Sequence, residues 1–184
     1  MSHRESRPLC GAAPPGRRHR GAWWAGAVLF LLQGAAVAAD CSVSAVGVAF
    51  GTYDPLAVTH VDATGSVSVR CVWTGSGGSG RQRVSPVISL NAGLPPGTLQ
   101  QRRLRTVAGD LLNYNLFRNA ARTQIWGDGS SGTYTAPTVP ATLVLPPSGH
   151  SRTGSRTVYG RMPAGQTHAA PGSYSDTITV TVTF

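Results

Sequence analysis

The chain has 184 residues, a length that suits one domain, and its 16 basic residues are all arginine because the sequence contains no lysine. Five arginines and Glu5 lie within residues 1–39. The remainder carries 11 arginines and 6 aspartates, so its net charge is 11 − 6 = +5, compared with +9 for the whole chain. This moderate surplus argues against a nucleic-acid partner and favours an anionic surface polysaccharide or lipid head group. Exclusive use of arginine is also what a GC-rich genome produces.

The first predicted element is an export signal over residues 1–39. Three arginines between residues 17 and 20 form its positive region, and an apolar run follows over residues 23–32. Residues 35–39 then supply the small side chains that a signal peptidase needs. The apolar run is shorter than the roughly 20 residues of a membrane span, so an uncleaved anchor is the weaker interpretation. The mature domain is therefore expected over residues 40–184.

Cysteine counting indicates an oxidising compartment. Cys10 leaves with the signal, and the mature domain keeps Cys41 and Cys71. An even pair in an exported chain predicts one disulfide, which would contribute about 3–4 kcal/mol by closing a loop of about 30 residues. The alternative is a pair of free buried thiols.

The elements expected after the signal are almost all strands, with little helix. Short runs with period-2 alternation are separated by stretches rich in Gly, Pro, Ser and Thr, as in a β-sandwich. Pro86 predicts an edge position or a bulge within its strand. The predicted strands cover residues 43–50, 66–73, 84–90, 111–117, 142–145 (a short edge strand), 157–162 and 174–184.

The last predicted strand shows the strictest alternation. Ile178, Val180, Val182 and Phe184 share one face, and four threonines share the other. A strand this apolar belongs inside a sheet, yet nothing follows it to cover its far side. Either an earlier strand pairs there, or an open edge remains beside an apolar groove. An open edge of this kind can accept a strand from another chain.

Motifs for catalysis, cofactors or metals are not apparent. Residues 75–80 match a dinucleotide-binding string, but residues 81–86 do not continue as the helix that would hold a pyrophosphate. The three histidines after residue 40 are far apart in sequence, without a second ligand at metal spacing. We therefore predict no catalytic residue, no cofactor and no metal, and the protein is not expected to be an enzyme.

Two charged motifs have simple structural interpretations. Asp128 lies between two glycines, where an aspartate most often closes a turn by bonding its own backbone. The cluster at residues 102–105 (Arg-Arg-Leu-Arg) could bind an anionic surface, but a solvated loop is the favoured interpretation.

Six segments, in order, together resemble the spore coat protein U domain family. They cover essentially all of residues 41–184: residues 41–55, 65–71, 112–117, 125–129, 158–166 and 172–184. The family includes spore coat proteins and pilus subunits of the archaic chaperone–usher type. The resemblance implies an immunoglobulin-like sandwich that lacks its final strand, with a disulfide joining Cys41 and Cys71. It implies a structural or adhesive subunit of a surface pilus or coat, passing through the periplasm to the cell surface.

The same resemblance implies partners. A periplasmic chaperone would cover the groove beside the last strand, and an outer-membrane usher would assemble the subunit. A neighbouring pilin-like subunit would then insert its own N-terminal strand. Ile178, Val180, Val182 and Phe184 are the residues expected to border this acceptor groove.

One departure from the family pattern concerns the donor strand. A polymerising subunit carries about a dozen residues before its first cysteine, whereas cleavage near Ala39 would leave only Asp40. Such a chain would accept a strand without donating one. The alternative function is a self-contained carbohydrate-binding module, which would show a closed sandwich and an exposed aromatic platform from Trp73, Trp126 or Tyr134.

Overall fold

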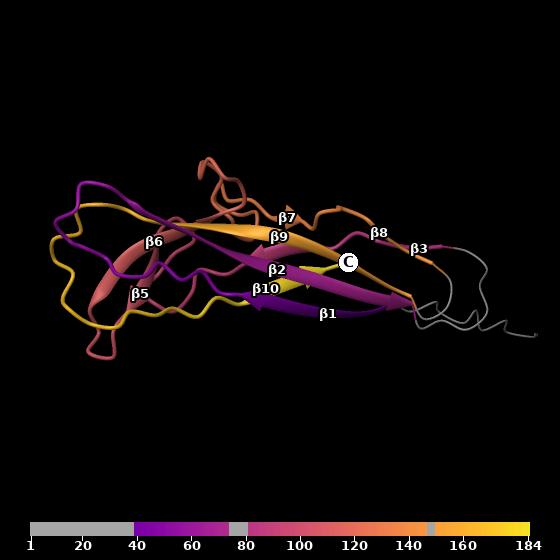
Figure 1. Ribbon diagram of the computed structural model, residues 1–184, viewed down its shortest axis with the longest axis horizontal. Helices are drawn as coiled ribbons and strands as arrows, with labels where there is room; N and C mark the ends of the chain where they lie inside the picture. Colours follow the sequence, from indigo (N-terminus) through magenta and orange to yellow (C-terminus); the bar gives the residue numbers. More distant parts are fainter. Residues whose placement is uncertain (1–38, 74–80, 147–149) are drawn as a thin grey trace, which may run out of the picture. The chain divides into compact units, whose positions relative to one another are not determined.

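The structure is a computed structural model that describes residues 39–73, 81–146 and 150–184. The regular secondary structure of these residues is entirely β (Figure 1). No helix long and apolar enough to cross a membrane occurs among them. The predicted export signal lies outside the described residues apart from Ala39, and so does the glycine-rich string at residues 75–80.

The larger sheet has five antiparallel strands in the order β1-β2-β9-β6-β5. The longest ladder joins β2 and β9, in which Val61 lies opposite Met162 and Val72 opposite Ser151. This ladder forms the centre of the sheet, with β1 at one edge and β5 at the other. The bounds are β1 Ala39–Val46, β2 Val61–Trp73, β5 Arg102–Arg105, β6 Leu111–Phe117 and β9 Ser151–Met162.

The second layer consists of shorter strands. A three-stranded sheet has the order β10-β4-β7, and β3 pairs separately with β8. In the β10–β4 ladder, Val180 lies opposite Leu90 and Val182 opposite Ile88. The bounds are β3 Gln82–Val84, β4 Val87–Leu90, β7 Ala136–Pro137, β8 Leu143–Leu145 and β10 Val180–Thr183.

The core lies between these layers and follows from period-2 alternation. In β2, Val67, Val69 and Cys71 are buried, while the residues between them point outward. Ile88 and Leu90 of β4 and Leu143 and Leu145 of β8 supply the opposite wall. The all-β sandwich predicted from the sequence is confirmed.

Several strand boundaries differ from those predicted. The strand at residues 111–117 forms as predicted, but β2 and β9 begin five and six residues earlier than expected. The last strand is regular only over Val180–Thr183, although Asn91 N–H donates to Thr179 O and extends its register. Pro86 separates β3 from β4, as expected for a residue that cannot donate to a ladder.

The arginine cluster at residues 102–105 is not the solvated loop that the sequence favours. It forms β5, the edge strand of the larger sheet, and Arg102 is fully buried. Its guanidinium donates to Asn91 O, Trp126 O and Asn115 Oδ1, at 2.6–3.0 Å. Oxygen atoms from three distant segments thus replace the water that a buried guanidinium loses.

Candidate functional site

The candidate site is a groove between two sheet edges, β1 and β10. Within the described part of the chain, β1 pairs only with β2, and β10 pairs only with β4. Figure 1 shows β1 and β10 next to each other, and residues of both strands line one cavity. A second cavity is lined by the start of β1 and by Phe184, which directly follows β10. We call this space the edge groove, bounded by residues 39–46 on one side and 176–184 on the other.

The inward face of β1 is poorly covered. Cys41 faces the core because it is bonded to Cys71, so Ala39, Val43 and Ala45 share its face. Val43 is nevertheless 45% exposed, whereas Val69 opposite it on β2 is fully buried. The second layer therefore covers β2 and stops short of β1.

The inward face of the last strand is only partly covered as well. Ile178, Val180 and Val182 pack against the core but remain partly exposed. Leu90 and Ile88, their neighbours on β4, are at most 2% exposed. Phe184 is 66% exposed. The predicted alternation is thus present, and its apolar side borders the groove.

The free edge of β10 carries the backbone groups of its inward-facing residues. Asn91 N–H donates to Thr179 O, so Thr179 and Asn91 form a hydrogen-bonded pair. Such pairs alternate along an antiparallel ladder, so Thr181 and Thr183 also bond to β4. Val180 and Val182 consequently direct their N–H and C=O groups into the groove.

The free edge of β1 has the matching arrangement. Cys41 and Cys71 lie directly opposite each other with their Cα atoms 4.1 Å apart. That spacing is typical of a pair that is not hydrogen-bonded across the ladder. Cys41, Val43 and Ala45 therefore direct their backbone groups away from β2, so the groove has ladder donors and acceptors on both walls. The predicted disulfide is confirmed, and it fixes this edge strand to the sheet.

Three hollows follow the groove. One of about 490 Å³ lies between the start of β1, β3 and Phe184. One of about 230 Å³ lies between the end of β1 and Ile178 and Val180. The third, about 790 Å³, is lined mainly by residues 48–53 and 169–176. Because the order along β1 is the reverse of that along β10, the two edges run antiparallel past each other.

Asp176 lines both the hollow of about 230 Å³ and the hollow of about 790 Å³, so it lies where these two meet. Its Oδ1 accepts hydrogen bonds from Leu94 N–H at 2.8 Å and from Thr177 N–H at 2.7 Å. Its Oδ2 accepts from the Tyr114 hydroxyl at 2.6 Å. Burial, and next the hydrogen bond to Asp176, raise the pKa of Tyr114 well above its ordinary range, so the phenol stays protonated and donates.

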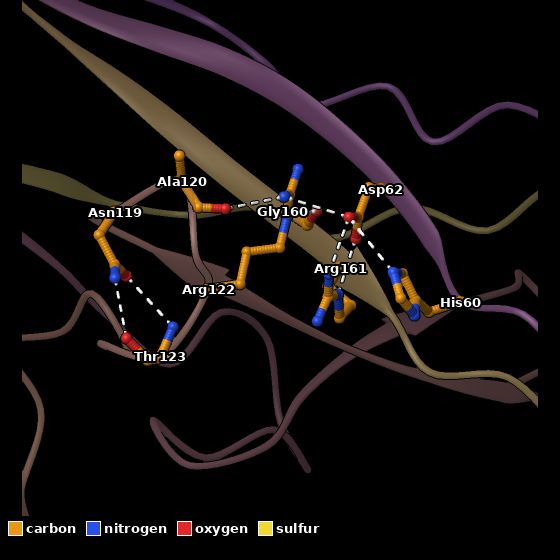
Figure 2. Close-up of polar contacts among 8 residues, drawn as sticks. All are labelled: His60, Asp62, Asn119, Ala120, Arg122, Thr123, Gly160 and Arg161. Carbon is orange, nitrogen blue, oxygen red and sulfur yellow. Dashed lines mark hydrogen bonds and ion pairs between the residues drawn. The ribbon is translucent and has the colours of Figure 1, made fainter.

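A second polar site lies on the outer face of the larger sheet (Figure 2). Arg161 of β9 donates to both carboxylate oxygens of Asp62 on β2, at 2.8 and 2.9 Å. Arg122 Nη1 and His60 Nε2 lie 3.1 and 3.4 Å from Asp62 Oδ2. The hydrogen bond from Arg161, more than any other contact, holds the pKa of Asp62 below its usual value.

This cluster has a structural role. Arg122 also donates to Gly160 O of β9 and Ala120 O, so it joins the 119–124 turn to the sheet. Asn119 closes the same turn through Thr123. The Asp62 carboxylate is paired with two arginines, and the arrangement offers neither a general base nor a ligand set for a metal. No group of three metal-ligating side chains occurs in the described part of the chain.

Two further sequence predictions concern single residues. Asp128 accepts a 2.8 Å hydrogen bond from Ser130 N–H, which confirms its role in a turn. The aromatic platform required by the carbohydrate-binding alternative does not form, because Trp73 and Trp126 are 5% and 0% exposed. Tyr134 is exposed, but the Arg118 guanidinium covers its ring at 4.4 Å.

Alternation in the sequence predicts the apolar face of the last strand, with Ile178, Val180, Val182 and Phe184, and that this face accepts a strand stays a prediction. The other wall of the groove is not identified by the sequence. Val43 and Ala45 also alternate, but alternation alone does not tell a covered strand from an uncovered one. The sequence does carry a signal for Asp176, because Asp176 precedes Ile178 by two residues and so shares its face of the strand.

The fold and the groove together define a class: a disulfide-linked β-sandwich subunit with two neighbouring open edges. The family model described as Spore Coat Protein U domain matches residues 27–181. The chain belongs to this family.

Two comparisons with individual proteins accompany this assignment. The chain is 35% identical over 146 residues to "Protein U" of Myxococcus xanthus, covering 73% of this chain and 70% of that protein. It is also similar to a chain in the crystal structure of the CsuC–CsuE chaperone–tip adhesion subunit pre-assembly complex, from archaic chaperone–usher Csu pili of Acinetobacter baumannii. That similarity has a TM-score of 0.49 and 23% identity, over 80% of this chain and 40% of the other.

Proposed function

We propose that this protein is a surface coat or pilus subunit whose sandwich is completed by an extended strand from another polypeptide. The observation that carries the proposal is the pair of open edges. Both walls of the groove direct backbone groups and apolar side chains into the same space. An inserted strand would pair its backbone with an edge and cover the inward face of each wall.

The proposed order of partners follows from the exposure of this groove. A partly exposed apolar surface beside an unpaired edge promotes aggregation, so it has to be covered during transit through the periplasm. A periplasmic chaperone would cover it first. During assembly at an outer-membrane usher, a strand of a neighbouring pilin-like subunit would replace the chaperone. The final location would be the cell surface or an extracellular fibre or coat.

The surplus of arginine suggests where the assembled subunit could meet anionic polysaccharide. Arg70, Arg81, Arg83 and Arg152 are exposed, and they lie on β2, β9 and at β3, close to the disulfide end of the sandwich. This contact would be electrostatic and would weaken as salt is added.

The export signal and the acceptor-only role belong to the same proposal. Removal of residues 1–39 would leave Asp40 alone before Cys41. The mature chain would then accept a strand without donating one. Intact-mass measurement of the exported protein tests this, and a mature N-terminus a dozen or more residues upstream of Cys41 would contradict it.

The experiment for the proposed function is a thermal melt of the exported chain with synthetic extended peptides. A peptide that binds only the folded state, at about 100 times its dissociation constant, adds roughly 2.7 kcal/mol of stability. We expect peptides with alternating apolar residues to raise Tm and a scrambled peptide of the same composition to leave it unchanged.

Matched variants locate the effect in the groove. Val180→Lys places a charge on the inward face of β10 and should abolish the peptide-dependent rise. Thr181→Lys places the same charge on the outward face and should retain it. A cooperative melt whose Tm does not change with any peptide would contradict the proposal. It would favour the alternative of a self-contained domain.

A further inference from the structure

The edge groove contains one charged group among its apolar side chains. Asp176, Ile178 and Val180 follow one another at two-residue spacing, and all three line the hollow of about 230 Å³. The other wall of this hollow is mostly apolar and includes Val46, Val48 and Phe50. A strand lying in the groove therefore meets apolar side chains at successive inward positions and a carboxylate at one of them.

The Asp176 carboxylate is held in place and has acceptor capacity left. Its Oδ1 accepts from two backbone N–H groups, and its Oδ2 accepts from Tyr114. An ionised carboxylate offers about four acceptor positions, so Oδ2 can accept one more hydrogen bond. Gly93 closes one side, since a Cβ there would collide with the carboxylate. The opposite side lines the two hollows.

The charge of Asp176 does not demand a cation from the partner. Arg102 is buried close by, and all its hydrogen bonds go to neutral oxygens of Asn91, Asn115 and Trp126. Its positive charge therefore remains available to offset the nearby carboxylate through space. A neutral donor such as a hydroxyl or an amide is therefore sufficient to supply the fourth hydrogen bond to the Asp176 carboxylate.

We propose that Asp176 sets the register of the completing strand, by accepting a hydrogen bond from a hydroxyl or amide side chain of that strand. The residues two positions to either side of that donor are apolar and fill the adjacent hollows. This inference rests on the proposed function and specifies the partner: an extended segment of another subunit, apolar at alternate positions, with one polar residue interrupting the apolar series.

A polar position in the groove prevents the inserted strand from slipping along it. A strand with only apolar inward residues can shift by two positions and still present the same face. With Asp176 in the groove, a shifted strand buries the carboxylate beneath an apolar side chain and leaves it short of a partner. A single polar contact therefore penalises every register except one, as a buried polar residue does in helical assemblies.

The test is a serine scan of a synthetic strand bound to the full exported chain. The probe is a peptide of about nine residues, long enough to span the groove from Asp176 to Phe184, with valine inward and threonine outward. Terminal lysines keep it soluble. One valine is replaced by serine at each inward position in turn, so all peptides have the same composition.

We expect one serine position to bind about ten-fold more tightly than the others, as for a hydrogen bond to a charged group. Asp176→Asn keeps the size of the side chain and an acceptor for Leu94 N–H, and it should reduce this preference. Asp128→Asn, in an exposed turn, should leave it intact. Peptides that bind equally well at all serine positions would overturn the register role while leaving the groove established. Absence of binding by every peptide would overturn both.

Discussion

Val43 and Val69 lie directly opposite each other in the ladder between β1 and β2, yet Val69 is fully buried and Val43 is 45% exposed. The two side chains are chemically identical and share one face of the sheet. Their difference in exposure therefore measures how far the second layer reaches, and it stops between β2 and β1.

This contrast predicts a difference in stability between two identical substitutions. Val69→Thr introduces a hydroxyl into the core and should destabilise the isolated subunit by about 1–3 kcal/mol. Val43→Thr should cost less than about 0.5 kcal/mol, because the side chain still reaches solvent. Urea denaturation of the exported, oxidised protein measures both. Equal costs would mean that β1 is already covered in the free subunit.

Proline substitution tests the direction of the backbone groups on β10. Val182→Pro removes an N–H that points into the groove, so the isolated subunit should lose little stability. Thr181→Pro removes an N–H bonded to β4 and should cost about 1–3 kcal/mol. Comparing the melting temperatures of the two variants gives the answer.

The same pair also separates folding from partner binding. Val182→Pro should retain its fold and bind extended peptides more weakly, because one edge donor is missing. If Val182→Pro were the more destabilising of the two, the free edge would have been assigned to the wrong set of residues.

Arg102 provides a test of buried polar satisfaction. Arg102→Met keeps the aliphatic length but leaves the carbonyls of Asn91 and Trp126 and the amide of Asn115 without their donor. We expect a loss of about 3–5 kcal/mol, as when one partner of a buried charged network is removed. Arg105→Met, on the exposed end of the same strand, should change stability by less than about 0.5 kcal/mol. Chemical denaturation distinguishes these values, and similar small losses would show that Arg102 is solvated.

Arg102 also shows where prediction from the sequence fails. The alternation of Ile178, Val180 and Val182 is local, so the strand and its inward face could be derived from spacing alone. The burial of Arg102 depends on oxygen atoms from three segments that only the tertiary structure brings together. An isolated run of arginines is normally solvated, and no local signal distinguishes this exception. The open groove is non-local in the same way, because it depends on where the second layer ends.

Gly160 predicts a packing constraint on the inner face of β9. A Cβ at this position would lie 2.7 Å from the side chains of Val48 and Phe50, which pack against β9 at Gly160. Gly160→Ala should therefore destabilise the subunit by about 1–3 kcal/mol through overpacking. Gly47→Ala, at a position with open space, is the matched control and should be close to neutral. Thermal unfolding of the two variants decides, and a neutral Gly160→Ala would mean that the 47–50 segment can move away from the sheet.

The Asp62 cluster predicts a dependence of stability on acid pH. The Arg161 hydrogen bond keeps the pKa of Asp62 below its usual value, so folding favours the ionised carboxylate. The resulting stability is fully present above the unfolded-state pKa of about 4, and it is lost as pH falls through the lower folded-state pKa. Because the pair is largely exposed, the contribution should be below about 1 kcal/mol.

Comparing two proteins that differ only at Asp62→Asn isolates this contribution. The reference protein for this comparison carries His60→Asn alone, and the variant carries Asp62→Asn as well. Asp62 is then left with its two arginine partners, Arg122 and Arg161. The difference in free energy of unfolding should be constant from about pH 6 to pH 8 and should shrink below about pH 4. A difference that persists at pH 2 would assign the effect to the shape of the side chain rather than to its charge.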